Sequence, residues 1–251
     1  MKKNFSDMLP PYRPFLLAEL QLPVPQTIAV LAPHPDDFDA VGVTLHRLHQ
    51  QGHLIHLAVL TTGANGIDDG WSGLYDASAK AVVREAEQQA SCEFFGLPAN
   101  RVSFLRLWQK TAEAGQAERD ESDKQALRAY LRITRPDMVF LPHGNDSNRT
   151  HRRTYQAFCE IAGQDGMKVL ACLNQDAKTE GMRADMYTYF GEQEAAWKAR
   201  LLRFHRSQHE RNLASRGHGF DERVLQVNRD AATKAGGALP YAEVFELQQF
   251  G

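Results

Sequence analysis

The stretch Ile28-Ala29-Val30-Leu31-Ala32-Pro33-His34-Pro35-Asp36-Asp37 joins an apolar run to an imidazole and two carboxylates. A short apolar run that ends at a proline is typical of a buried strand, and open α/β sheets bind ligands beyond the carboxyl ends of such strands. Imidazole and carboxylate groups are good zinc ligands, and a carboxylate left off the metal can take a proton from an activated water. The stretch therefore predicts an α/β sheet with a candidate site at its edge.

The rest of the pattern agrees with this sheet. From Thr27 onward, short apolar runs alternate with amphipathic stretches, as in βα units of a mostly parallel sheet. We predict a Rossmann-like α/β fold with helices on both faces of the sheet. Strands are expected at 27–33, 54–61, 102–107, 137–142, 168–173 and 185–190, and helices at 39–51, 77–95, 121–134, 151–163 and 193–213. The glycines in 216–219 and 235–237 indicate surface turns in an irregular C-terminal quarter.

Length and composition limit the domain organisation and the partners. We expect one domain over residues 27–251, preceded by a proline-rich N-terminal arm, 1–26, that docks through Phe15, Leu16 and Leu17. With 29 basic and 31 acidic side chains the net charge is −2, which argues against nucleic acid or an anionic membrane as partner. A small-molecule substrate is expected, with a homo-oligomer as the working hypothesis for assembly.

Cysteine usage and the N-terminus predict the compartment. The three cysteines lie far apart in apolar segments and form no CxxC pair, which is typical of buried thiols in a reducing environment; they are Cys92, Cys159 and Cys172. No stretch is long and apolar enough to span a bilayer, and the N-terminus has no apolar signal-peptide core. We therefore expect a cytoplasmic protein.

A second polar cluster, Pro142-His143-Gly144-Asn145-Asp146-Ser147-Asn148-Arg149-Thr150-His151, also follows an apolar strand. Because parallel strands end at one edge of the sheet, His34, Asp37 and His151 are predicted to converge on one ion. Two histidines and a carboxylate leave a zinc position open, as in catalytic sites. Asp36 is then the predicted general base. The same ligands also suit iron(II).

Together these motifs resemble the PIG-L/LmbE-like zinc-dependent N-acetylglucosaminyl de-N-acetylases. Further matches are Thr61-Thr62-Gly63, Arg84-Glu85, Phe95-Gly96-Leu97, Lys198, Ser207-Gln208 and Tyr241-Ala242-Glu243-Val244-Phe245. The resemblance implies that His34, Asp37 and His151 bind zinc, that Asp36 is the base, and that Arg84 contacts a sugar hydroxyl. The implied reaction is hydrolysis of the acetyl group from the amide nitrogen of an N-acetyl amino sugar or its conjugate.

The chain departs from the family pattern at Asn148. The family's second motif usually ends in His-Pro-Asp-His, whereas this chain has Asn148-Arg149-Thr150-His151. The asparagine amide can donate a hydrogen bond to substrate or to an oxyanion, but it cannot deliver a proton. The candidates for the acid are His143, His205, His218 or Asp36 returning its own proton. Asp146 is a candidate for orienting a catalytic group.

The substrate contacts are expected in the loops. Loops 63–76 and 174–184 are predicted to set specificity, with Trp71, Tyr75 and Trp108 as an apolar wall under a sugar ring. The family's glycine pair after the first motif is reduced here to Gly42.

Each motif also has a plainer interpretation. His-Pro-Asp-Asp alone is typical of a capped turn, Arg84-Glu85 of a solvated helix face, and the i, i+4 pair His205 and His209 of another solvated face. Two other functions stay open: a non-hydrolytic sugar-binding protein, and a metallophosphoesterase suggested by Gly144-Asn145-Asp146 but lacking the companion two-metal motifs. No G-x-G-x-x-G follows the first strand, which disfavours a dinucleotide enzyme.

Overall fold

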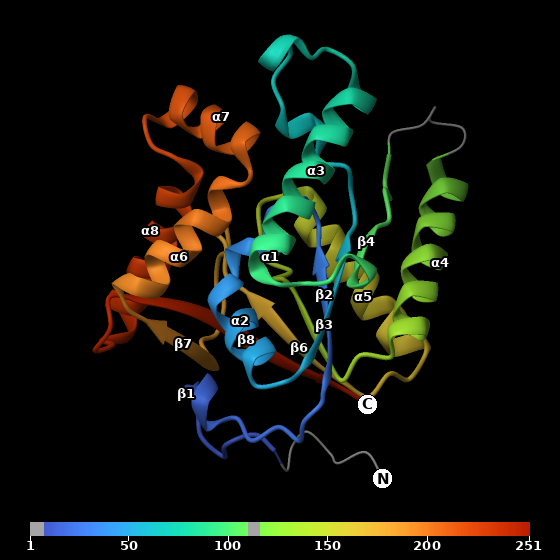
Figure 1. The fold of residues 1–251 in the computed structure, drawn as a ribbon. Helices are drawn as coiled ribbons and strands as arrows, with labels where there is room; N and C mark the ends of the chain where they lie inside the picture. Colours follow the sequence, from blue (N-terminus) through green and yellow to red (C-terminus); the bar gives the residue numbers. More distant parts are fainter. Residues whose placement is uncertain (1–7, 110–115) are drawn as a thin grey trace.

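A computed structural model describes residues 8–109 and 116–251 (Figure 1). The strands are β1 (Phe15–Leu16), β2 (Thr27–Ala32), β3 (Leu54–Val59), β4 (Val102–Phe104), β5 (Met138–Pro142), β6 (Val169–Asn174), β7 (Met186–Phe190) and β8 (Tyr241–Phe250). The α-helices are α1 (Asp37–Ala40), α2 (Gly42–Gln50), α3 (Ala77–Phe95), α4 (Gln116–Thr134), α5 (Arg149–Gln164), α6 (Glu192–Arg203), α7 (Arg206–Arg216) and α8 (Phe220–Ala235). Short 3₁₀ turns cover Leu17–Glu19, Ala64–Gly66, Trp71–Gly73 and Ala99–Arg101.

The described strands form one eight-stranded sheet in the order β1-β7-β8-β6-β5-β2-β3-β4. Neighbours from β6 through β4 are parallel, whereas β8 is antiparallel to both β6 and β7. The chain moves outward from β2 through β3 to β4, and then returns to place β5 on the other side of β2. The strand order thus reverses between β2 and β5, and such a reversal creates the ligand crevice of an open α/β sheet.

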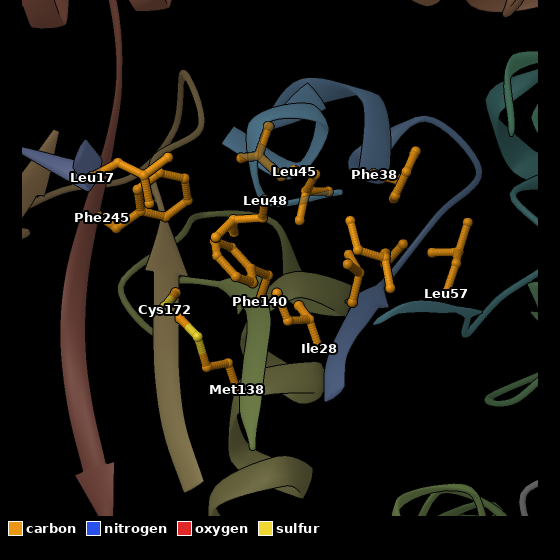
Figure 2. Packing of buried hydrophobic residues seen from close by; sticks show 14 of the residues in the cluster. Leu17, Ile28, Phe38, Leu45, Leu48, Leu57, Met138, Phe140, Cys172 and Phe245 are labelled. Atoms are coloured by element: carbon orange, nitrogen blue, oxygen red, sulfur yellow. The ribbon is translucent and has the colours of Figure 1, made fainter. Parts of the chain in front are cut away.

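Helices cover both faces of the sheet, as predicted. Successive side chains of β2 alternate between two apolar clusters. Ile28 and Val30 pack with Leu45 and Leu48 of α2, and Figure 2 labels Ile28 and the two leucines within this cluster. The opposite face of the sheet packs against α4 and α5. The prediction of a Rossmann-like α/β fold is therefore confirmed.

Three parts of the secondary structure differ from the prediction. The helix expected at 39–51 is divided into α1 and α2, and the one expected at 193–213 into α6 and α7. The C-terminal quarter is not irregular, because it forms α8 and the ten-residue strand β8. Tertiary contacts cause these differences: buried polar side chains bind the backbone at the first break, and β8 fills a gap between two strands already in the sheet.

The described part of the N-terminal arm packs on the domain through two of the three predicted residues. Phe15 and Leu17 are buried, whereas Leu16 is 43% exposed. β1 extends the sheet by pairing with β7. Residues 1–7 of the predicted arm lie outside the described residues. Cys92, Cys159 and Cys172 are free thiols, and none of the described helices has the length and apolar character needed to cross a membrane.

Candidate active site

The ends of β2 and β5 bring the three predicted metal ligands together. One nitrogen each from His34 and His151 and one oxygen of Asp37 lie within 4.8 Å of one another. Asp37 is central: its Oδ2 lies 3.1 Å from His34 Nδ1, and its Oδ1 lies 3.5 Å from His151 Nε2. Burial alone would raise the pKa of Asp37. The facing imidazoles of His151 and His34 have the larger effect and hold this pKa below its ordinary value.

His151 lies between two carboxylates. Its Nδ1 is 2.9 Å from Asp146 Oδ2, so that its Nε2 faces Asp37. Burial alone would lower the pKa of His151, but Asp37 and Asp146 raise it to about 10. The surroundings of this imidazole therefore favour a positive charge, and two nitrogens with one carboxylate are a donor set that fits zinc or iron(II).

Asp146 and Asp176 also lie near His151 in a second group of potential ligands. This group shares His151 with the first, and Asp146 contacts the imidazole nitrogen that faces away from Asp37. A carboxylate in that position is typical of the outer residue that orients a metal-binding histidine. The geometry thus favours one ion with a supporting carboxylate over two ions.

Asp36 is held in an unusual backbone conformation beside the ligands. Its φ of 111° lies in a region that costs a non-glycine residue about 1–3 kcal/mol. The Asp36 N–H donates to Gln88 Oε1 at 2.9 Å, and its side chain accepts from Arg84 at 2.7 Å. Burial raises the pKa of Asp36, and the positive charge of Arg84 opposes this. These contacts hold the Asp36 side chain and backbone in place next to the predicted ligands.

Arg84 is buried and bound by protein groups. It is 1% exposed and donates to Asp36, to the carbonyl of Pro35 and to Glu87. Glu87 in turn accepts from the Ser207 backbone and hydroxyl at 2.6 and 2.7 Å. The solvated-face interpretation of Arg84-Glu85 is therefore wrong. The contacts favour a role for Arg84 in positioning Asp36.

Gly63 allows the loop after β3 to pass close to the first motif. It has a φ of 64°, and a Cβ atom there would lie 2.7 Å from Pro35 Cδ and 3.2 Å from Arg84 Nε. A side chain at this position would therefore push against the turn that carries Asp36. Gly42, by contrast, begins α2 and faces Leu201 of α6, where a Cβ would come within 2.8 Å.

The oxygen and the nitrogen of the Asn148 side-chain amide can serve different purposes. Asn148 is the N-cap of α5, and its Oδ1 accepts from the Thr150 N–H at 2.9 Å. The side chain also lines the cavity. Because the oxygen is used by the helix, the Nδ2 amide, which has no partner among the described residues, is the end that can donate to a ligand.

The candidate site opens into a cavity of about 620 Å³, a size typical of small-molecule sites. Its described lining includes His34, Asp36, Asp37, Asn148 and His151. Both predicted specificity loops contribute to its wall, with Gly63–Gly66 from one and Asp176 and Lys178 from the other. Trp108 lines the cavity, whereas Trp71 and Tyr75 do not belong to its described lining. Trp71 instead donates from its indole to Glu210 at 2.9 Å, and Tyr75 is 73% exposed.

None of the three histidines considered as the acid belongs to the described cavity lining. His143 Nε2 is 3.3 Å from Glu246 on β8, and His218 contacts the Gly219 carbonyl. His205 is fully buried, and its Nε2 lies 2.6 Å from Asp39 Oδ2. The solvated-face interpretation of His205 is therefore wrong, because the break between α6 and α7 turns this imidazole inward.

A polar network behind Asp36 was not found from the sequence. Gln88, which accepts from the Asp36 N–H, also donates to Asp39 at 3.0 Å, and Asp39 contacts His205. Arg84 and Gln88 stand four residues apart on α3, which places them on one helix face. This spacing is the signal that could have linked them.

Comparisons with known proteins support the family. Residues 29–162, more than half of the chain, match the family PIG-L, described as GlcNAc-PI de-N-acetylase. The chain is 25% identical to a Bacteroides thetaiotaomicron protein named "Putative glucosamine-6-phosphate deaminase-like protein", in a match that covers 60% of this chain and 28% of that protein. The chain therefore spans under a third of that relative's length.

Solved structures share the fold at low identity. The N,N'-diacetylchitobiose deacetylase of Pyrococcus horikoshii superposes with a TM-score of 0.69 at 18% identity, over 88% of this chain and 83% of that chain. GalB, the 4-carboxy-2-hydroxymuconate hydratase of Pseudomonas putida KT2440, gives 0.64 at 19% identity, over 89% and 96%. The fold thus carries more than one reaction, and family membership rests on the sequence match: the chain belongs to the PIG-L family.

Proposed function

We propose that this protein is a metal-dependent hydrolase that removes an acetyl group, or another short acyl group, from the amide nitrogen of an N-acetyl amino sugar or its conjugate. The observation that carries the proposal is the separate carboxylate of Asp36 beside the cluster of His34, Asp37 and His151 in one cavity. A site that only binds a sugar has no need of a fixed carboxylate next to a metal-binding cluster.

His34, Asp37 and His151 would hold the ion, and zinc and iron(II) both suit this donor set. When bound, the ion supplies Lewis-acid polarisation of the amide carbonyl and of the attacking water. Asp146 keeps the His151 imidazole turned so that Nε2 faces Asp37. The protein thus contributes an oriented donor set and an open cavity above it.

The proton transfers are assigned to Asp36. Its carboxylate takes the proton of the attacking water, and Arg84 and Gln88 hold it in place for that step. The Nδ2 amide of Asn148 donates to the carbonyl oxygen as negative charge develops there. No further histidine belongs to the described cavity lining, so Asp36 also returns the proton to the leaving amine nitrogen.

Acetate release and metal content, measured on the same preparations, test this proposal. The wild type is expected to carry about one zinc or iron ion per chain and to release acetate from an N-acetyl amino sugar. Asp36→Asn should keep the ion and lose about 10²- to 10⁴-fold in kcat, the range for a general acid–base group. His151→Ala should lose both the ion and the activity.

Asp230→Asn is the matched control, because Asp230 is an exposed carboxylate on α8 that does not belong to the described site lining. Full activity in Asp36→Asn would remove Asp36 as the base. A wild type that takes up neither zinc nor iron(II) would refute the metal site. Release of phosphate from phosphate esters without acetate release would favour the metallophosphoesterase alternative.

A further inference from the structure

The outer part of the cavity has an excess of positive charge. Apart from the residues assigned above, its described lining includes five cationic side chains and two carboxylates: Arg149, Arg153, Lys178, Arg211, Arg223, Asp120 and Asp176. These come from α4, α5, α7, α8 and the loop after β6. Positive charge thus lies on several walls of one cavity, and a bound divalent ion would add to it.

Both carboxylates of this lining already have a cationic partner. Arg153 pairs with Asp120 and stacks 4.8 Å from the centre of the Trp108 ring. Arg223 lies 3.9 Å from Asp176, at the limit of an ion pair. The remaining three cations therefore have no carboxylate partner in the described lining.

Arg149 and Lys178 are the clearest unpaired charges. Neither side chain has an ion pair or hydrogen bond to another described residue. Arg211 contacts the Gly66 carbonyl at 3.3 Å and lies 3.5 Å from Asp68, an exposed residue outside the lining. Exposed arginines and lysines are common, but here they share a cavity with the reacting groups.

The loop that carries Lys178 is fixed to the loop that leads into α5, whose first residue is Arg149. The Ser147 N–H donates to the Lys178 carbonyl at 3.2 Å, and the Glu180 N–H donates to the Asn145 carbonyl at 3.1 Å. Asp146 and Thr179 form an isolated β-bridge between the same two segments. Two unpaired cations are therefore held on neighbouring segments at the mouth of the site.

We propose that a cationic rim, made of Arg149, Lys178 and Arg211, binds an anionic group on the substrate. The preferred substrate is then an N-acyl amino sugar that carries a phosphate or a carboxylate, either on the sugar or on its aglycone. Guanidinium and ammonium groups form charge-assisted hydrogen bonds with both anions. This proposal rests on the proposed function and extends it to the substrate class.

A substrate panel tests the rim. Acetate release is compared for N-acetylglucosamine, its 1-phosphate, its 6-phosphate and N-acetylmuramic acid, so that phosphate and carboxylate are separated. The wild type is expected to show a kcat/KM at least about tenfold higher for an anionic member than for the neutral sugar, since a hydrogen bond to a charged group is worth that much or more. This preference should shrink as salt rises, because exposed charges are screened.

Charge-neutralising variants show whether the rim is responsible. Arg149→Gln and Lys178→Gln should each lower the ratio of anionic to neutral kcat/KM by about tenfold, the value of one lost charge-assisted bond. Arg132→Gln is the matched control: its side chain is 68% exposed and pairs with Asp165, and neither residue belongs to the described cavity lining. This control should leave the ratio unchanged. Equal kcat/KM values for neutral and anionic substrates, or an unchanged ratio in both rim variants, would overturn the proposal.

A binding measurement keeps failure of the rim separate from failure of the proposed reaction. Calorimetric titration compares glucosamine 6-phosphate and glucosamine 1-phosphate with glucosamine, with no turnover required. If no substrate is hydrolysed, tighter binding of a phosphorylated amine that is weakened in Arg149→Gln still supports the rim. Equal affinity for the charged and neutral amines, together with no preference in turnover, refutes it.

Discussion

At the scale of single residues, Asp146 orients His151, one of the three proposed metal ligands. Its Oδ2 contacts His151 Nδ1 at 2.9 Å, and its Oδ1 accepts from the Asn148 N–H at 2.7 Å. The side chain of Asp146 is fully buried. The carboxylate is thus fixed on one side by the backbone and fixes the imidazole on the other.

Removing this carboxylate should weaken metal binding. Asp146→Ala is expected to lower metal affinity by about 10- to 100-fold, as is usual when the outer partner of a histidine ligand is lost. Asp146→Asn, which keeps an oxygen for Nδ1, should recover part of the loss. Competition with a chelator of known affinity measures both variants, and unchanged affinity in Asp146→Ala would exclude the orienting role.

The grouping of His34, Asp37 and His151 could be predicted from the sequence, because the segments that carry them follow two apolar strands of one parallel sheet. The groups that hold Asp36 could not. Gln88, Glu87 and Ser207 are polar residues within helices, and helical spacing alone does not distinguish a buried network from a solvated face. Only the packing of α7 against α3 brings Ser207 to Glu87.

At the scale of elements, the break between α1 and α2 has a clear cause. Glu243 on β8 accepts from the N–H groups of Val43 and Thr44 and so binds the first turn of α2. Lys198 on α6 donates to the last carbonyl of α1, at Ala40, and to Glu243, both within 2.7 Å. One buried ion pair therefore closes the end of one helix and the start of the next.

Breaking this ion pair should destabilise the protein strongly. Lys198→Met leaves the Glu243 carboxylate buried without its partner and is expected to lower the free energy of unfolding by about 3–5 kcal/mol. The double variant Lys198→Met/Glu243→Gln should be more stable than Lys198→Met alone, because no unpaired charge remains. Urea titrations of the wild type and the variants measure both differences; additive losses would show that the two groups are not coupled.

Helices and strands could be predicted where the local pattern of apolar and polar residues determines them. The strands of the parallel half and α3, with its Gly96 cap at a φ of 91°, follow from local sequence. The helix break at Val41 could not be predicted, because the residues that cause it lie about 160 and 200 positions further along the chain.

At the scale of the whole molecule, buried histidines make stability depend on pH. His53 is 3% exposed, and its Nδ1 accepts from the Gln26 N–H at 3.1 Å, which joins the start of β2 to the start of β3. Burial lowers the pKa of His53 below its ordinary value of 6.5. On acidification the unfolded chain therefore takes up this proton first, so the stabilisation present above pH 6.5 is lost as pH falls through the lowered pKa.

A non-titrating acceptor at this position should reduce the acid sensitivity. His53→Asn keeps an oxygen near the position of Nδ1 and cannot be protonated in this range. The free energy of unfolding, measured by denaturant titration at pH 7.5 and pH 5.5, should fall less in His53→Asn than in the wild type. An equal fall in both proteins would show that His53 does not contribute.

The position of β8 also affects how the protein is made. This strand comes last of the eight in sequence, yet it lies inside the sheet between β6 and β7 and carries Glu243. A ribosome releases it after every other strand, so during synthesis β6 and β7 each present an open edge, the kind of surface on which nascent chains aggregate. Until β8 inserts, Lys198 and the first turn of α2 lack the Glu243 carboxylate. The junction of α1 and α2, which follows the motif that carries Asp36 and Asp37, is therefore among the first parts of the chain to be synthesised and among the last to gain all of its contacts.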